Sequence, residues 1–397
     1  MKKISVLIFV FTIFPFLAFS QIKNRTFLPQ YHRLLKEALE KSGERKDSLR
    51  YFLNTVPKQQ YEAASFLIAF MPERDLKTLT IPYIKDQLEG AFKARRDFSW
   101  CAQLPDSIFY NEVLPYYCFD EKRDNWRNDF YLKFAPLVKD CKDIRQAIKA
   151  VNSNARKILA VDYNVNRSIV NISPFQSIEE KMATCTGLSF LLVDAFRSVG
   201  IPARMAGTPM WTNMKGNHSW VEVWVDGQWY FTEYYFEDLN KAWFVADAGR
   251  ADISNPRHWI YASSYKPKET YFRLEWDTLS RAIHAENVTQ RYIDIYEKQK
   301  QLENLKPDEI WISLQLYKSK LDKKEQRISE KITIVKEGKD LDFGYSPSPI
   351  DDLNKFLKFK VTKNTTYQIV YTDDKGKEKR TEIAVKNNEE LFNLYQE

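Results

Sequence analysis

The sequence lacks the features that mark several common classes of protein. It has no run of five or six like charges, although 60 basic and 53 acidic residues give a net charge of +7. Because the two signs are interspersed, nucleic-acid binding is not expected. No internal repeat and no low-complexity tract is present, and hydrophobic residues make up 44% of the 397 residues. A folded protein of two or three domains is therefore expected, and a disordered chain is excluded.

Cysteine and histidine are also scarce, with four of each. No CxxC pair occurs, and no cysteine has a histidine three to five residues away, so neither a zinc site nor any other metal or cofactor is expected. The cysteines are Cys101, Cys118, Cys141 and Cys185. They allow two disulfides, or one disulfide with one spare thiol and one working thiol. In the second case Cys101, Cys118 and Cys141 could pair in three ways.

One long apolar run is present, and it lies at the N-terminus. Lys2 and Lys3 precede the apolar stretch 4–17, and Ala18-Phe19-Ser20 is a small-x-small cleavage site. Residues 1–20 are thus predicted to be a signal peptide, and the protein is predicted to be exported, to the periplasm or outside the cell. The run is too short for a membrane span, and no other stretch is long enough, so no span is expected.

The remaining chain divides by its hydrophobic pattern into parts that predict an α+β protein. Helical spacing of apolar residues dominates 21–139, and a mixed core follows over 140–285. A charged helical linker is predicted over 286–306. Alternating stretches rich in Ile, Val and Tyr then predict a C-terminal β-sandwich-like domain over 307–397.

Within the core, Cys185 stands just before a segment with helical spacing. The stretch KMATCTGLSFLLVDAF places apolar residues along one face, and Gly200 and Pro202 favour an end to the helix. A helix over about 186–199 is predicted, with Cys185 at its N-terminus. A lone cysteine is more often a buried structural residue. At a helix N-terminus, however, the partial positive charge favours the thiolate form, which is the nucleophile.

The stretch NHSWVEVWVDGQWYFTEYY predicts a β-hairpin. Asp226-Gly227 is a favoured two-residue turn, which makes the numbers of paired residues sum to 453. This register predicts that Tyr235 lies directly opposite His218. It also predicts that Glu233 lies diagonal to His218 on the same face, about 7 Å away at the backbone. A glutamate side chain can cover that distance.

Cysteine, histidine and an acid together are the requirements of thiol catalysis. A histidine beside the thiol accepts and returns the proton, and an acid fixes its tautomer. We assign these roles to Cys185, His218 and Glu233, in that order. The backbone N–H of Cys185 is placed to bind an oxyanion.

These segments resemble the transglutaminase-like core of the papain-like cysteine fold, as in exported bacterial members. The matching stretches are ATCTGLSFLLVDAFRSVGIPARM, NHSWVEVWVDGQWYF and the acid that follows. The resemblance assigns Cys185 as nucleophile and His218 as base. Glu233, four residues after Trp229, falls at the acid position. The family has aspartate there, followed by proline.

That departure leaves Glu237 and Asp238 as alternatives to Glu233 for the third position. The resemblance implies an exported thiol enzyme, a peptidase, amidase or acyl transferase, that forms a thioester with a peptide, protein or glycopeptide. Because the superfamily includes noncatalytic relatives, the alternative is an inactive scaffold that binds peptide or glycan. No calcium-site cluster is visible, and the oligomeric state is left open.

Overall fold

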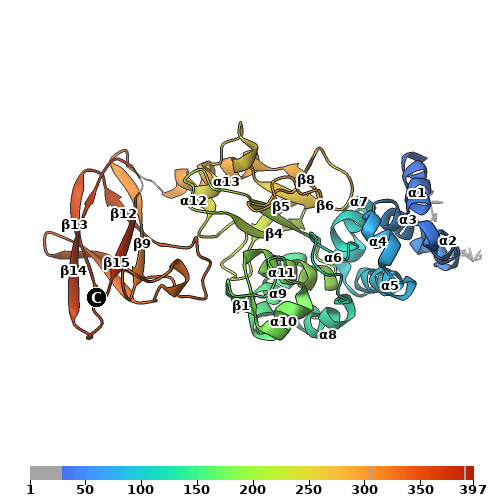
Figure 1. Ribbon diagram of the computed structural model, residues 1–397, viewed down its shortest axis with the longest axis horizontal. Helices are drawn as coiled ribbons and strands as arrows, with labels where there is room; N and C mark the ends of the chain where they lie inside the picture. Colours follow the sequence, from blue (N-terminus) through green and yellow to red (C-terminus); the bar gives the residue numbers. More distant parts are fainter. Residues whose placement is uncertain (1–28, 304–305, 389) are drawn as a thin grey trace, which may run out of the picture.

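The computed structural model describes residues 29–303, 306–388 and 390–397, and the predicted signal peptide lies outside them. The predicted α+β class is confirmed. A helical N-terminal part, a mixed central part and a β-domain follow one another along the long axis of the molecule (Figure 1). Within the described ranges, no helix has both the length and the apolar character needed to cross a membrane.

The N-terminal helices pack directly on the central domain. One continuous hydrophobic core runs from Leu35 through the helices to Ala285 of the central sheet. The helices before the nucleophile are α1 (Pro29–Lys41), α2 (Lys46–Thr55), α3 (Tyr61–Ala69), α4 (Glu73–Thr78), α5 (Ile81–Asp97), α6 (Ser99–Ala102), α7 (Asp106–Ile108), α8 (Arg127–Val138), α9 (Ile144–Leu159) and α10 (Pro174–Glu180).

Helix α11 (Cys185–Ser198) is the centre of this core. The sequence predicted one apolar face, but every residue from Thr186 to Ser198 is buried. The reason is that α8 and α9 pack against α11, which also lies on two strands of the central sheet. Arg197 is tolerated there because its Nε donates to the carbonyls of Glu112 (3.1 Å) and Ala203 (3.0 Å).

The central sheet has six strands in the order β5-β4-β3-β6-β8-β7, with antiparallel neighbours throughout. The strands are β3 (Ala203–Thr208), β4 (His218–Val225), β5 (Gln228–Thr232), β6 (Tyr261–Ser264), β7 (Thr270–Tyr271) and β8 (His284–Asn287). A separate parallel pair, β1 (Asp162–Tyr163) and β2 (Met182–Ala183), precedes α11, and the short helix α12 (Val245–Ala248) follows β5.

The predicted hairpin register holds from Val225–Gln228 to Val221–Thr232. The extrapolation beyond it was wrong, because β5 ends at Thr232 and Tyr235 does not pair with His218. The carbonyl of Glu233 accepts a hydrogen bond from Asn152 Nδ2 (3.0 Å) instead of continuing the ladder. The chain therefore leaves the sheet just before the acid.

Helix α13 (Thr289–Glu303) occupies the segment predicted to be a linker, and it packs on the central domain. Tyr292 is buried, and its hydroxyl accepts a hydrogen bond from Trp220 Nε1 at 2.6 Å. Strand β8 also extends two residues past the predicted boundary at 285. The central domain thus includes both elements.

The C-terminal domain consists of two packed sheets that share one apolar core. One sheet has the order β11-β10-β13-β14 and the other β12-β9-β15, in which β15 is parallel to β9 and the remaining pairs are antiparallel. The strands are β9 (Glu309–Tyr317), β10 (Lys331–Lys336), β11 (Lys339–Tyr345), β12 (Leu357–Thr362), β13 (Thr365–Thr372), β14 (Glu378–Val385) and β15 (Leu391–Tyr395).

Candidate active site

Cys185 is the first residue of α11, as the sequence predicted to within one position. The β1–β2 pair fixes the approach to this helix, and Thr184 then takes an extended conformation as its N-cap. The Thr184 side chain makes no capping hydrogen bond. The half-buried thiol therefore lies at a helix N-terminus whose first turn has no side-chain cap.

His218 begins β4 and is 3% exposed. Three aromatic rings enclose the imidazole, with ring-centre distances of 5.6 Å to Trp220, 4.8 Å to Trp243 and 5.1 Å to Phe244. This enclosure restricts the rotation of the imidazole and excludes water from its faces. A base of this kind needs a polar partner at each ring nitrogen, and the structure supplies one at both.

Glu233 lies at one of these nitrogens, with its Oε2 3.2 Å from His218 Nε2. Trp243 Nε1 donates to the same oxygen at 3.2 Å, so the carboxylate is held by two groups. Of the alternative acids, Asp238 instead forms an ion pair with Lys241 (3.6 Å). Glu237 is exposed, and its pKa is raised by partial desolvation of the carboxyl and by the charge of Glu233.

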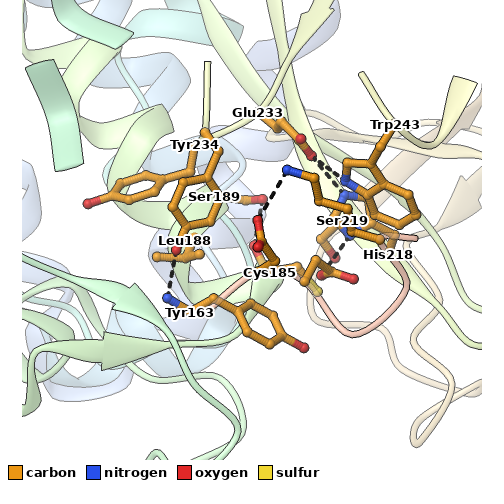
Figure 2. Close-up of a pocket in the computed structure, with 13 residues that line it drawn as sticks. Tyr163, Cys185, Leu188, Ser189, His218, Ser219, Glu233, Tyr234 and Trp243 are labelled. Atoms are coloured by element: carbon orange, nitrogen blue, oxygen red, sulfur yellow. Dashed lines mark hydrogen bonds and ion pairs between the residues drawn. The ribbon is translucent and has the colours of Figure 1, made fainter. Parts of the chain in front are cut away.

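A second acid, Asp352, lies at the other ring nitrogen and was not among the predicted site residues. Its Oδ2 is 3.2 Å from His218 Nδ1, without the alignment of a good hydrogen bond, so the contact is mainly electrostatic. Cys185 Sγ, a ring nitrogen of His218 and a carboxylate oxygen of Asp352 all lie within 4.8 Å of one another. Figure 2 shows Cys185 and Glu233 approaching His218 from different sides.

The charges of these groups support one another. Burial disfavours the imidazolium, but the charge of Asp352 and the interactions with Cys185 and Glu233 outweigh it and raise the pKa of His218 well above its usual value. Burial similarly opposes the Asp352 carboxylate, yet the His218 charge and the N–H of Asn354 lower its pKa. Each group therefore favours the charged form of the other.

A thiol, an imidazole and a carboxylate at this separation are also a donor set that suits zinc. Cys185, His218 and Asp352 are thus the described residues that would hold a divalent ion if one were bound. The His218–Asp352 ion pair balances the charges of the two groups.

The two sides of Cys185 differ in openness. On the side of Glu233 and Asp352 the cavity is only about 20 Å³, little more than one water requires. On the other side a cavity of about 240 Å³ is lined by Arg167, Lys215 and Lys324, among others. There is therefore little free space beside Cys185 on the side of Glu233 and Asp352, and more on the side lined by Arg167, Lys215 and Lys324.

The other three cysteines do not share this environment. All four thiols are free, so the disulfide that the cysteine count allowed is not formed. Cys101 is buried against Gly200, and burial raises its pKa to about 12. Burial also raises the pKa of Cys118 well above its usual value. These two buried thiols are poor nucleophiles.

Residues 134–234 match the model of the Transglutaminase-like superfamily. The chain contains a transglutaminase-like domain. The matched segment includes Cys185, His218 and Glu233, whereas Asp352 lies outside it. The resemblance inferred from the sequence motifs is therefore confirmed, and the second acid comes from a part of the chain that follows the transglutaminase-like domain.

The chain is also similar to solved structures, among them the following two. One is a proposed cysteine protease from Cytophaga hutchinsonii, at 18% identity and a TM-score of 0.28, covering 36% of this chain and 47% of that one. The other is described as a TGase, at 18% identity and a TM-score of 0.23, covering 27% and 31%. The chain thus aligns with less than half the length of either structure. A search of curated proteins found no match.

Proposed function

We propose that this protein is an exported thiol enzyme that cleaves or transfers amide bonds through a thioester on Cys185. The observation that supports this most strongly is the position of Cys185, at a helix N-terminus and within 4.8 Å of a buried histidine. Glu233 holds the opposite nitrogen of that histidine.

The chemistry runs in two halves. The Cys185 thiolate attacks the amide carbonyl, and the negative oxygen of the tetrahedral intermediate is bound at the start of α11. The His218 imidazolium gives its proton to the leaving amine as the C–N bond breaks, which leaves a thioester. His218 then takes a proton from water, and the hydroxide attacks the thioester to release the acid and the thiolate. An amine in place of water gives transfer. We favour hydrolysis, because no separate cross-linking specificity is visible in the sequence.

Trapping of the acyl-enzyme tests this proposal. The mature chain is incubated with a library of peptide and glycopeptide amides, with and without a labelled primary amine, and intact mass is recorded at short times. We expect an adduct on Cys185 and product formation, both lost in Cys185→Ala and retained in Cys141→Ala. A chain that forms no adduct, and whose Cys185 reacts with iodoacetamide no faster than an ordinary thiol even in Asp352→Asn, would instead be a scaffold that binds peptide or glycan.

Two carboxylates contact His218, so a second prediction concerns which of them orients the imidazole. If Glu233 orients the ring, Glu233→Gln lowers kcat by about 10²-fold or more with little change in KM, since the ring loses its charged partner at Nε2. Glu233→Asp, which restores the residue typical of the family, is expected to keep most of the activity. Asp352 would be the orienting acid if Glu233→Gln were nearly neutral while Asp352→Asn abolished turnover.

A further inference from the structure

The loop between β11 and β12 lies in the active-site cleft, although it belongs to the C-terminal domain. Its residue Asp352 is 5% exposed and lies against His218, and Leu353 packs against the core of the central domain. The small cavity on this side of Cys185 is lined by Asp351, Asp352 and Lys355 of the same loop. The loop therefore forms one wall of the cavity beside Cys185 and His218.

The C-terminal domain holds the loop in one conformation. Arg327 is fully buried and donates to four backbone carbonyls, those of Ser348 (2.9 Å), Lys355 (3.2 Å), Asp351 (2.5 Å) and Asp352 (2.5 Å). A buried guanidinium must satisfy its donors, so this arrangement fixes the loop strongly.

The central domain in turn has a surface shaped for the loop. Asn354 Nδ2 donates to the carbonyl of Asn217, the residue before His218, at 2.7 Å. Tyr235 donates to the carbonyl of Ile350 at 3.1 Å. Gly216 has a φ of +132°, which favours glycine, and a Cβ there would lie 2.8 Å from Asn354 Oδ1. The contact is thus a specific one made by backbone and side chains of both domains.

The nitrogen that Asp352 contacts is the one that catalysis needs. Glu233 lies at Nε2. The Cys185 thiol clusters with Asp352 and not with Glu233, and Asp352 lies at Nδ1. We therefore take Nδ1 as the nitrogen that exchanges a proton with Cys185. A carboxylate at Nδ1 competes with the thiolate for the imidazolium. It also stands where the leaving amine must collect its proton.

We propose that the β11–β12 loop is an autoinhibitory segment, in which Asp352 ties up the catalytic histidine until substrate or another event displaces the loop. This inference rests on the proposed function. It assigns opposite effects to the two acids at His218: Glu233 supports the base, and Asp352 restrains it.

The rate of iodoacetamide labelling of Cys185 at pH 7, located by peptide mass, measures the restraint without a known substrate. Asp352→Asn removes the competing charge, and Asn354→Ala loosens the loop while leaving that charge in place. Each variant is expected to raise the labelling rate by about fivefold or more, the lower end of the coupling usually found between two interacting sites. Asp342→Asn, an exposed acid on β11, is the matched control and should leave the rate unchanged.

Hydrogen exchange of residues 346–355 is recorded on the same samples. Faster exchange in Asn354→Ala together with faster labelling supports the proposal. Three results would overturn it: slower labelling in Asp352→Asn, which would make Asp352 an activating residue, unchanged labelling despite faster exchange, or unchanged exchange in Asn354→Ala. The acyl-enzyme experiment is independent: faster labelling without any acyl-enzyme would retain the docked loop and reject the enzymatic function.

Discussion

Replacing His218 with alanine is expected to lower kcat for amide cleavage by about 10²–10⁴-fold, the contribution typical of a positioned general acid–base. The side chain is buried against aromatic rings, has an acid at each ring nitrogen, and lies within 4.8 Å of the Cys185 thiol. Alanine removes both the proton shuttle and the charge beside Cys185. KM should change little, because the buried imidazole offers a substrate little surface. The measurement is steady-state kinetics on an amide identified by acyl-enzyme trapping.

His258 provides the control for this prediction. Its Nδ1 lies 3.0 Å from the carbonyl of Met210, and it makes no contact with Cys185 or His218 among the interactions of the described residues. His258→Ala should change kcat less than about twofold at equal folded fraction. If His218→Ala kept a tenth or more of the activity, His218 would not be the base.

The effect of His218→Ala on the reactivity of Cys185 can also be measured without a substrate. In the Asp352→Asn background, iodoacetamide labelling of Cys185 should fall by about tenfold or more when His218 is also replaced, because a free cysteine is only a few per cent thiolate at pH 7. The two changes are coupled, since both act on one imidazolium. Asp352→Asn should therefore have little effect when His218 is absent.

The positions of Cys185 and His218 within their helix and strand could be predicted from local sequence patterns. Cys185 and His218 lie at the starts of a helix and a strand whose signals are short-range: a change of periodicity and an Asp-Gly turn. Register arithmetic placed Glu233 on the correct side of His218, although the pairing ends one residue earlier. The side chain still reaches the ring because Asn152 binds the backbone carbonyl of Glu233 and Trp243 binds its carboxylate, both from outside the hairpin.

The remaining parts of the site depend on contacts that no local pattern encodes. Asp352 reaches His218 only because the C-terminal domain docks on the cleft, and Arg327 shapes the loop from within that domain. Trp243 follows β5 in an irregular segment, where spacing predicts nothing about its direction. Gly216 is a residue whose identity reflects the docking of the two domains, because it lies directly against Asn354 of the C-terminal domain. The sequence alone does not show that contact.

Replacing Glu222 with alanine is expected to lower the free energy of unfolding of the central domain by about 3–5 kcal/mol, the usual cost of breaking a buried ion pair. Glu222 is 1% exposed and lies on β4. Arg204 Nε donates to its Oε2 at 2.8 Å, and Tyr292 donates to its Oε1 at 2.8 Å, beside an ion pair with Arg291. Alanine would leave the 2%-exposed Arg204 without its main partner, although Glu286 remains 3.0 Å away.

This network connects the stability of the sheet to the geometry of the site. Tyr292 of α13 accepts from Trp220 Nε1 while it donates to Glu222, and the Trp220 ring stacks on His218 at 5.6 Å. Loss of Glu222 should therefore loosen α13 as well as β4, and hydrogen exchange of both elements should rise together. Urea unfolding followed by tryptophan fluorescence gives the magnitude.

The exposed ion pair between Arg33 and Glu37 on α1 provides the comparison. Glu37→Ala should change stability by less than about 0.5 kcal/mol, because solvent already screens that pair. The two glutamates differ in burial and in the number of partners, so the difference between the variants isolates the cost of an uncompensated buried cation. A loss below about 1 kcal/mol in Glu222→Ala would mean that Glu286 or water takes over the guanidinium of Arg204. The network would then position Trp220 without contributing much to stability.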